Sequence, residues 1–230
     1  MSDSAVNVIY EDNHLLALNK PAGLPTMGTP DGQPTLLTLA KDYVKQKYQK
    51  PGNVYLGVVS RLDAPVTGVV LLARTSKAAR RLAEQFREHV VRKTYWVLVE
   101  GAIEPPSASY VDWLGQDERH RRMHVVGCTL PGAKEARLAY RRLSVFRAMS
   151  LVEVELETGR KHQIRLQLAH HGYPVVGDRK YGSRAPFPAG IALHARRLVV
   201  VHPVRGDALT LEAPLPKSWP GRLAAPRESS

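Results

Sequence analysis

A single aspartate, Asp63, lies in a short loop between two apolar segments that are typical of β-strands, Val54 to Val59 and Val69 to Ala73. Loops that rigid strands hold in place often carry the catalytic groups of a protein. A carboxylate that is buried without a partner is costly, so this position requires a compensating interaction. The segment Thr158 to Arg165 contains an arginine that could supply it.

Segments with the apolar pattern of strands outnumber helical segments along the chain. They are Val6 to Tyr10, Leu15 to Asn19, Val54 to Val59, Val69 to Ala73, Thr94 to Val99, Leu138 to Val145, Leu151 to Leu156, Leu198 to Val201 and Leu209 to Leu211. Helices are interspersed without a regular strand–helix alternation. This pattern predicts an α+β fold with a mixed, largely antiparallel central sheet and flanking helices.

Three segments are expected to form helices. Thr35 and Ser76 are good N-caps for two amphipathic helices, because a hydroxyl can accept a hydrogen bond from the first helical turn. A third helix is expected to start near Lys161 and to stop at Gly172, which suits a left-handed cap. The polar, basic residues from Gly115 to Gly127 are expected to form an excursion outside the regular elements.

The charge of the chain indicates a polyanionic partner. Lysine and arginine number 33 against 21 acidic residues, which gives a formal net charge of +12. Nucleic acid is the leading candidate for a partner of such a protein, although a solvated basic surface has the same composition. Basic clusters that could grip phosphates are Arg119 to Arg122, Arg141-Arg142, Arg160-Lys161, Arg179-Lys180 and Arg196-Arg197.

The sequence also bounds the location of the protein. Cys128 is the only cysteine, which excludes a disulfide within the chain and fits a reducing compartment. Met1 to Tyr10 lacks the basic and apolar regions of a secretory signal, and no apolar run approaches the roughly 18 residues of a membrane span. We therefore expect a cytoplasmic protein that has no membrane partner.

Several segments together resemble the RluA-type pseudouridine synthase family. Around its catalytic aspartate the family reads approximately His-Arg-Leu-Asp-x-x-Thr-Ser-Gly, and a later segment reads Gly-Arg-x-His-Gln-Ile-Arg. The chain matches these motifs at Arg61, Leu62, Asp63, Gly68, Gly159, Arg160, His162, Gln163, Ile164 and Arg165, and it matches a Lys-x-Tyr motif at Lys93-Thr94-Tyr95. It departs from the first motif at Ser60, where the family often has histidine, and at Val66-Thr67, where it often has Thr-Ser.

Further similarity covers nearly the whole chain. It includes Lys20-Pro21-Ala22-Gly23, Gly177-Asp178, Tyr181-Gly182 and Leu193-His194-Ala195. Because the first of these lies close to the N-terminus, we expect one catalytic domain over residues 1–216 without the accessory RNA-binding domain that many relatives carry ahead of it. Residues 217–230 are polar and are expected to form a flexible tail.

The resemblance implies roles for particular residues. Asp63 would be the catalytic carboxylate, Arg165 its ionic partner, and Tyr95 the aromatic ring against the uracil face. The residues that would contact the substrate are Arg61, Leu62, Arg160, His162, Gln163 and Ile164. Taken alone, Asp63 would be a turn residue, Tyr95 a core residue and Arg165 a solvated helix residue. His162 and Gln163 could equally shape their loop or touch a phosphate.

The implied reaction needs neither a metal nor a redox cofactor, because it is an isomerisation. Gly-rich nucleotide-binding loops are absent from the sequence. His120, His124 and Cys128 recur every four residues, as metal ligands on a helix would. However, Gly127 and the basic neighbours of these residues disfavour a helix, and structural zinc prefers four closed ligands.

The sequence therefore predicts an RNA pseudouridine synthase that acts on uridine in a stem-loop of ribosomal or transfer RNA. No obligate protein partner is evident. The main alternative is a non-catalytic RNA-binding protein or ribosome-assembly factor on the same scaffold. A glycosidase is a weaker alternative, because such enzymes usually use two carboxylates and no second acid stands out near Asp63.

Overall fold

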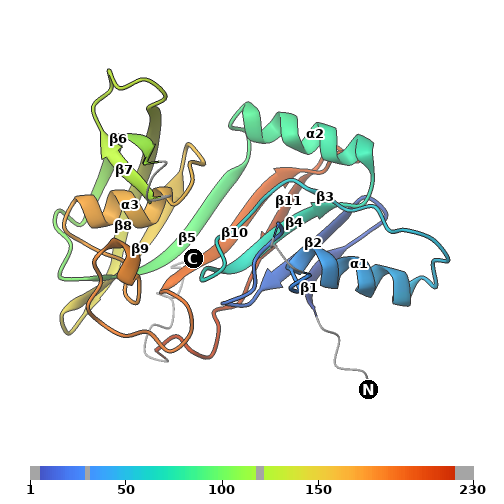
Figure 1. Ribbon diagram of the computed structural model, residues 1–230, viewed down its shortest axis with the longest axis horizontal. Helices are drawn as coiled ribbons and strands as arrows, with labels where there is room; N and C mark the ends of the chain where they lie inside the picture. Colours follow the sequence, from blue (N-terminus) through green and yellow to red (C-terminus); the bar gives the residue numbers. More distant parts are fainter. Residues whose placement is uncertain (1–5, 29–31, 118–121, 221–230) are drawn as a thin grey trace. The chain divides into compact units, whose positions relative to one another are not determined.

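The computed structural model describes residues 6–28, 32–117 and 122–220 (Figure 1). These residues form eleven β-strands, three α-helices and one short 3-10 helix, so the expected α+β class is confirmed. The chain divides into two compact units. The first unit comprises Met1–Arg92 and Ala195–Leu215, and the second unit comprises Lys93–His194 and Pro216–Ser230. The expectation of one catalytic domain stays a prediction, and residues 221–230 of the expected tail lie outside the described residues.

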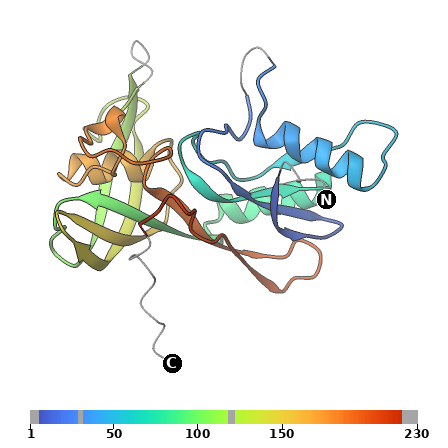
Figure 2. The same cartoon turned by 90° about the horizontal axis from the view of Figure 1, so that it is seen from below.

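The first unit is built on antiparallel strands. They are β1 (Asn7–Glu11), β2 (Leu15–Lys20), β3 (Gly57–Val58), β4 (Thr67–Ala73), β10 (Leu193–Val201) and β11 (Ala208–Glu212). Strand β2 pairs with β1 on one side and β4 on the other, while β3 pairs with β4. Strands β10 and β11 form a hairpin in which Leu198 lies opposite Leu211, and Figure 2 shows the two strands side by side.

Two helices cover the two faces of this sheet, α1 (Leu36–Lys47) and α2 (Ser76–Arg87). Because successive side chains of a strand point to opposite faces, the apolar run of β2 is divided between two cores. Leu15 and Ala17 pack in a cluster with Leu82 of α2, whereas Leu16 and Leu18 pack in a cluster with the α1 side. No helix in the described part of the chain is both long and apolar enough to cross a membrane.

The helix starts follow the capping chemistry closely. Thr35 caps α1 as expected, since its hydroxyl accepts from the Thr38 amide while the Thr38 hydroxyl accepts from the Thr35 amide. For α2, the expected cap at Ser76 is wrong by one residue. Thr75 is the N-cap and accepts from the Ala78 amide, and Ser76 is the first helical residue. Both neighbours carry a hydroxyl, so composition alone did not distinguish them.

The second unit contains a five-stranded antiparallel arrangement in the order β5-β9-β8-β6-β7. Its elements are β5 (Arg92–Glu100), β6 (Ser107–Asp117), β7 (Arg122–Val126), β8 (Lys134–Phe146), β9 (Met149–Leu156), helix α3 (Gln163–His170) and the 3-10 helix Arg179–Tyr181. Leu166 of α3 packs in a cluster with Leu114, Met123, Ala136 and Tyr181. The helix therefore covers one face of these strands.

Two expectations about strands are corrected. Only Gly57 and Val58 of the expected segment 54–59 form a strand, because Val54 and Leu56 are buried against the α1 core without strand partners. The described residues of the region 115–127 do not form an irregular excursion, since residues 115–117 at the end of β6 pair antiparallel with residues 122–124 of β7. The alternation of buried Met123 with exposed neighbours gives β7 one apolar face despite its basic composition.

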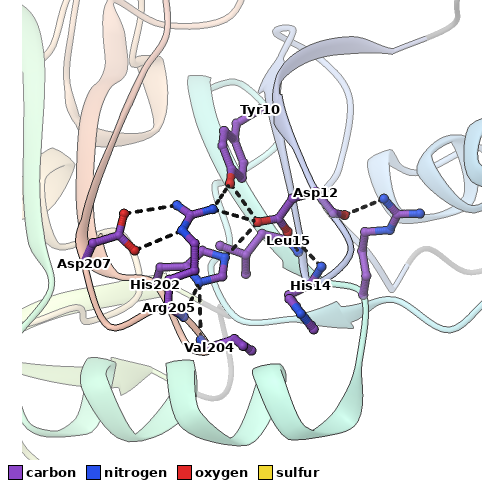
Figure 3. A network of polar contacts seen from close by, with 9 residues as sticks. Tyr10, Asp12, His14, Leu15, His202, Val204, Arg205 and Asp207 are labelled. Carbon is purple, nitrogen blue, oxygen red and sulfur yellow. Dashed lines mark hydrogen bonds and ion pairs between the residues drawn. The ribbon is translucent and has the colours of Figure 1, made fainter.

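A polar network within the first unit joins the turn between β1 and β2 to the turn between β10 and β11 (Figure 3). One carboxylate oxygen of Asp12 accepts from the backbone amides of His14 and Leu15, each at 2.7 Å. Its other oxygen lies 2.7 Å from the Tyr10 hydroxyl and 2.8 Å from Nε2 of buried His202. Desolvation raises the pKa of the Asp12 carboxyl, but these hydrogen bonds outweigh it and lower the pKa to about 2.

His202 holds the second turn through its other ring nitrogen. Nδ1 of His202 accepts a hydrogen bond from the Arg205 amide at 3.0 Å, which assigns the ring proton to Nε2 and directs it at Asp12. The Arg205 guanidinium in turn binds Asp207 at 3.0 Å and the Tyr10 hydroxyl at 2.9 Å. The network saturates its own donors and acceptors, which is typical of a structural element.

Gly68 allows β4 and β10 to approach each other closely. Its φ is +112°, and a Cβ at this position would lie 2.3 Å from the carbonyl oxygen of Ala195. We expect Gly68→Ala to lower the free energy of unfolding by about 2 kcal/mol or more, because the clash is with rigid backbone. Thermal unfolding followed by circular dichroism measures this effect. Gly52→Ala is the matched control, since a Cβ there meets nothing within 4 Å; equal melting temperatures for both variants would contradict the argument.

Candidate functional site

Asp63 lies in the loop between β3 and β4, in the first unit. Its backbone carbonyl accepts from the Val66 amide at 3.0 Å, which closes a tight turn before β4 begins. Asp63 and Leu62 are half-buried, whereas Arg61 is exposed. The loop therefore presents one partly desolvated carboxylate at the start of a fully buried strand.

The residues next to Asp63 are fixed by a buried cation, Lys20. This lysine is the last residue of β2 and is fully buried. Its ammonium donates to the carbonyl of Ala64 at 2.9 Å, and to those of Pro21 and Leu24 at 2.9 and 2.7 Å. An ammonium has three N–H donors, so each of them has a carbonyl acceptor.

The buried charge of Lys20 also acts on Asp63 directly. Desolvation lowers the pKa of Lys20 to about 8, against the attraction of the Asp63 carboxylate, which raises it. Below that pH the ammonium is charged. The Asp63 carboxylate thus attracts the buried ammonium that fixes the main chain beside it.

Three further hydrogen-bonding groups fix the Asp63 loop. The hydroxyl of buried Thr26 accepts from the Leu62 amide at 3.1 Å and donates to the Leu62 carbonyl at 2.9 Å. The Gly23 amide donates to the Ala64 carbonyl at 2.8 Å. The Ser60 hydroxyl accepts from the Leu71 amide of β4 at 2.8 Å. The main chain is thus bonded on both sides of Asp63.

Sequence reasoning did not assign Lys20 or Thr26 to the site. Lys20 appeared only in a segment of family similarity, and Thr26 lies in a Gly- and Pro-rich stretch without periodicity. The sequence does contain an indication of the role of Lys20. This residue ends an apolar strand, where a charged side chain requires a compensating partner. However, the partners of Lys20 are main-chain carbonyls, and a pattern of side chains cannot predict which carbonyls will lie beside it.

The remaining predicted site residues belong to the second unit. Tyr95 is half-buried in β5 and lies opposite Val154 of β9. Its neighbour Trp96 points to the other face, where its indole nitrogen donates to Glu153 at 3.2 Å. Tyr95 consequently shares the face of β5 that also carries Lys93.

Arg165 is buried in α3 and forms a bidentate ion pair with Asp178. Its Nε lies 2.6 Å from one carboxylate oxygen and its Nη2 lies 2.9 Å from the other. The interpretation of Arg165 as a solvated helix residue is therefore wrong. Asp178 was not identified as a partner from the sequence. The predicted pairing of Arg165 with Asp63 joins residues of the two units, and it stays a prediction.

Gln163 fixes the loop that precedes α3. Its side-chain oxygen accepts from the Thr158 hydroxyl at 2.8 Å and from the Arg160 amide at 2.9 Å. Its amide nitrogen donates to the Arg137 carbonyl of β8 at 2.9 Å. Both ends of this buried amide are bonded within the protein, which favours a role for Gln163 in shaping the loop.

The other residues of this motif surround the start of α3. His162 is the N-cap, with φ of +56°, and its Nδ1 lies 2.7 Å from the Tyr181 hydroxyl. Ile164 is buried. Arg160 is exposed and its Nε donates to the Glu135 carbonyl at 2.9 Å. The sequence motif thus combines buried residues that order the segment with two exposed cations, Arg160 and Lys161.

The helical arrangement that a metal site at His124 would need is not found. His124 lies on strand β7. His120 lies outside the described residues. Among the residues that the structure describes, no group of three His, Cys, Asp or Glu side chains is placed to hold a metal ion.

The role of Lys20 can be tested with Lys20→Met, which keeps the apolar stem but removes the donors. We expect the variant to lose about 2 kcal/mol of unfolding free energy or more, because three carbonyls lose their partner. Hydrogen exchange of the Leu62 and Val66 amides should accelerate. Lys77→Met, at an exposed position of α2, is the control. Unchanged exchange in Lys20→Met would show that the other bonds suffice to hold the loop.

The chain is similar to known proteins over most of its length. The family model for RNA pseudouridylate synthase matches residues 14–170. The ribosomal large subunit pseudouridine synthase D of Xanthomonas campestris is 36% identical, over 99% of this chain and 71% of that protein. An uncharacterized RNA pseudouridine synthase of Bacillus subtilis is 33% identical, over 92% of this chain and 69% of that protein.

A solved structure extends the comparison to the fold. The human RNA pseudouridylate synthase domain containing 4 has a TM-score of 0.76 and 26% identity, and the match covers 92% of this chain and 89% of that chain. The family model spans more than half of the present chain, and the curated relatives match nearly all of it. The chain therefore belongs to the RNA pseudouridine synthase family, a family of isomerases.

Proposed function

We propose that this protein converts uridine to pseudouridine in ribosomal RNA, with Asp63 as the catalytic carboxylate. The observation that carries the proposal is the fixed position of Asp63, which lies between two residues whose main chain is bonded to buried Lys20 and Thr26. A reacting group that is held in one geometry lowers the entropic cost of catalysis. A simple turn aspartate needs no buried cation beside it.

The reaction breaks the bond between N1 of uracil and C1′ of the ribose, rotates the base, and joins C5 to C1′. The hydrogen on C5 is lost and N1 gains one, so the atoms balance without an oxidant or reductant. An ionised carboxylate can act at the base or at the sugar. In either case the Asp63 carboxylate lies close enough to the buried Lys20 ammonium to attract it.

Arg165 is the proposed second ion partner of Asp63. Its bidentate bond to Asp178 fixes the plane of the guanidinium, because the two bonds use Nε and Nη2. A guanidinium that is oriented in this way can present its remaining N–H groups in a defined direction. Asp178 would then be a positioning residue that acts through Arg165.

Tyr95 is proposed to lie against the face of the flipped uracil. A base must leave its stack to be modified, which costs a few kcal/mol and least when the nucleotide is already unpaired. Stacking on an aromatic ring returns about 1–3 kcal/mol per base. Among the residues proposed to contact the substrate, Arg61 and Arg160 are exposed and can reach phosphates, whereas buried Ile164 would form an apolar wall.

Large-subunit ribosomal RNA is the proposed substrate, because matched relatives carry that RNA in their names. Transfer RNA is the alternative. Pseudouridine mapping of total RNA from cells with and without this protein distinguishes the two. The same experiment separates the enzyme from the non-catalytic RNA-binding alternative, which predicts no site that depends on the protein.

We expect Asp63→Asn to abolish pseudouridine formation while it leaves the affinity for RNA largely unchanged. The substitution removes the charge and keeps the size of the side chain. Single-turnover assays on the mapped RNA measure the loss. Asp42→Asn, at an exposed position of α1, is the matched control and should react at the wild-type rate. Activity retained in Asp63→Asn would contradict the proposed mechanism.

Arg165→Lys should reduce the single-turnover rate at saturating RNA by about 100-fold, because lysine keeps the charge but loses the fork that fixes its direction. Thermal unfolding of the same variant reports how much of the effect is structural. Arg141→Lys, in an exposed ion pair with Glu153, is the control. If Arg165→Lys reacts at the wild-type rate, Arg165 is not an ion partner of Asp63 in the proposed site.

A further inference from the structure

Two cations meet in the second unit at the loop before α3. Lys93 is half-buried at the start of β5, and its ammonium nitrogen lies 3.9 Å from the position that a Cβ on Gly159 would occupy. Arg160 is the next residue of that loop. The pKa of Lys93 is lowered mainly by desolvation. The like charge of Arg160 lowers it further.

Lys93 differs from the other buried cations of the protein in having no acceptor. Within the described residues it makes no hydrogen bond and no ion pair. Lys20, by contrast, donates to three carbonyls, and Arg165 binds both oxygens of Asp178. An ammonium that is removed from water without a partner destabilises the fold, so it requires another reason to be present.

The acidic residues nearest in the sheet are directed elsewhere. Glu155 pairs in register with Thr94, so it lies on the opposite face of the sheet from Lys93. Glu135 forms an ion pair with Arg137. Glu135 also attracts Arg160, and both arginines lower the pKa of its carboxyl. Neither carboxylate bonds to the Lys93 ammonium, so an anion from outside the protein would give that ammonium an acceptor.

The loop that brings Arg160 to Lys93 is ordered in advance. The Thr158 hydroxyl accepts from the Arg137 amide at 2.8 Å, and the Thr158 and Arg160 ends of the loop both bond to the side-chain oxygen of Gln163. Gly159 exposes its backbone to the Lys93 ammonium without a side chain between them. An anion binding here would not need to order the loop, which reduces the entropic cost of binding.

We propose that Lys93 and Arg160 together bind one phosphate of the RNA, the one beside the uridine whose base lies against Tyr95. Lys93 and Tyr95 are two residues apart on the same face of β5, a separation of about 7 Å. A base and its own phosphate can span this distance within one nucleotide. The inference rests on the proposed function, because it takes Tyr95 as the surface that receives the base.

The first test compares stability with affinity in Lys93→Met. Removing an unpaired, half-buried charge should leave the melting temperature unchanged or raise it, whereas binding of RNA should weaken by about tenfold. The probe is a fluorescent nonamer of oligouridylate, which offers a uridine and its flanking phosphates in every register. Lys45→Met, at an exposed position of α1, is the matched control and should keep the wild-type affinity.

The second test measures the phosphate contact itself through its dependence on salt. Each phosphate contact to a single strand contributes about 0.7 to the slope of log K against log salt, so Lys93→Met should lower that slope by about this amount. Lys93→Arg should restore it. Arg160→Gln should weaken binding too, and the double variant should lose less than the sum of the two single losses, because both side chains would share one phosphate.

Wild-type affinity and slope in Lys93→Met, or fully additive losses in the double variant, would overturn the proposal. If Lys93→Met does not fold, Arg160→Gln provides the test, because Arg160 is exposed. An unchanged slope of log K against log salt in Arg160→Gln would then overturn the proposal of a shared phosphate. These binding measurements are independent of turnover. If the proposed function is wrong, pseudouridine mapping will instead show the same modified sites in cells with and without this protein.

Discussion

The ammonium of Lys20 and its three carbonyl acceptors are the interaction on which the candidate site depends. One charged group is removed from water at the end of β2, and its bonds reach forward to the loop that carries Asp63. Because the acceptors belong to the main chain, they fix backbone rather than side chains. The Asp63 carboxylate in turn attracts this ammonium and raises the pKa of Lys20 against the effect of burial.

Polar side chains that are buried or half-buried order loops in both units. Asp12 holds the turn between β1 and β2 in the first unit, and Gln163 holds the loop before α3 in the second, each through bonds to main-chain groups. In these cases every principal donor or acceptor is used within the protein. Lys93 differs, since its charge is partly desolvated and finds no acceptor among residues 6–28, 32–117 and 122–220. That contrast separates groups that build the fold from a group available to a ligand.

Local sequence patterns predicted most helices and strands correctly. They failed where contacts between residues far apart in the sequence determine the structure. The alternation in β2 and the capping box of α1 report on neighbours a few residues away, so β2 and α1 were predicted correctly. The hairpin of β6 and β7 was missed because its apolar face depends on packing against α3. Likewise, the motifs pointed to Asp63 and Arg165. Lys20 and Asp178 come to lie beside them only through tertiary structure, which periodicity in the sequence does not encode.

Ser60 occupies a position where the resembling family often has histidine, and its hydroxyl holds the loop to β4 through the Leu71 amide. An imidazole changes charge between pH 5 and 8, whereas a serine hydroxyl does not titrate in water at any biological pH. The bond from the Leu71 amide to Ser60 is consequently independent of pH, unlike the bonds from the Lys20 ammonium, whose pKa is about 8.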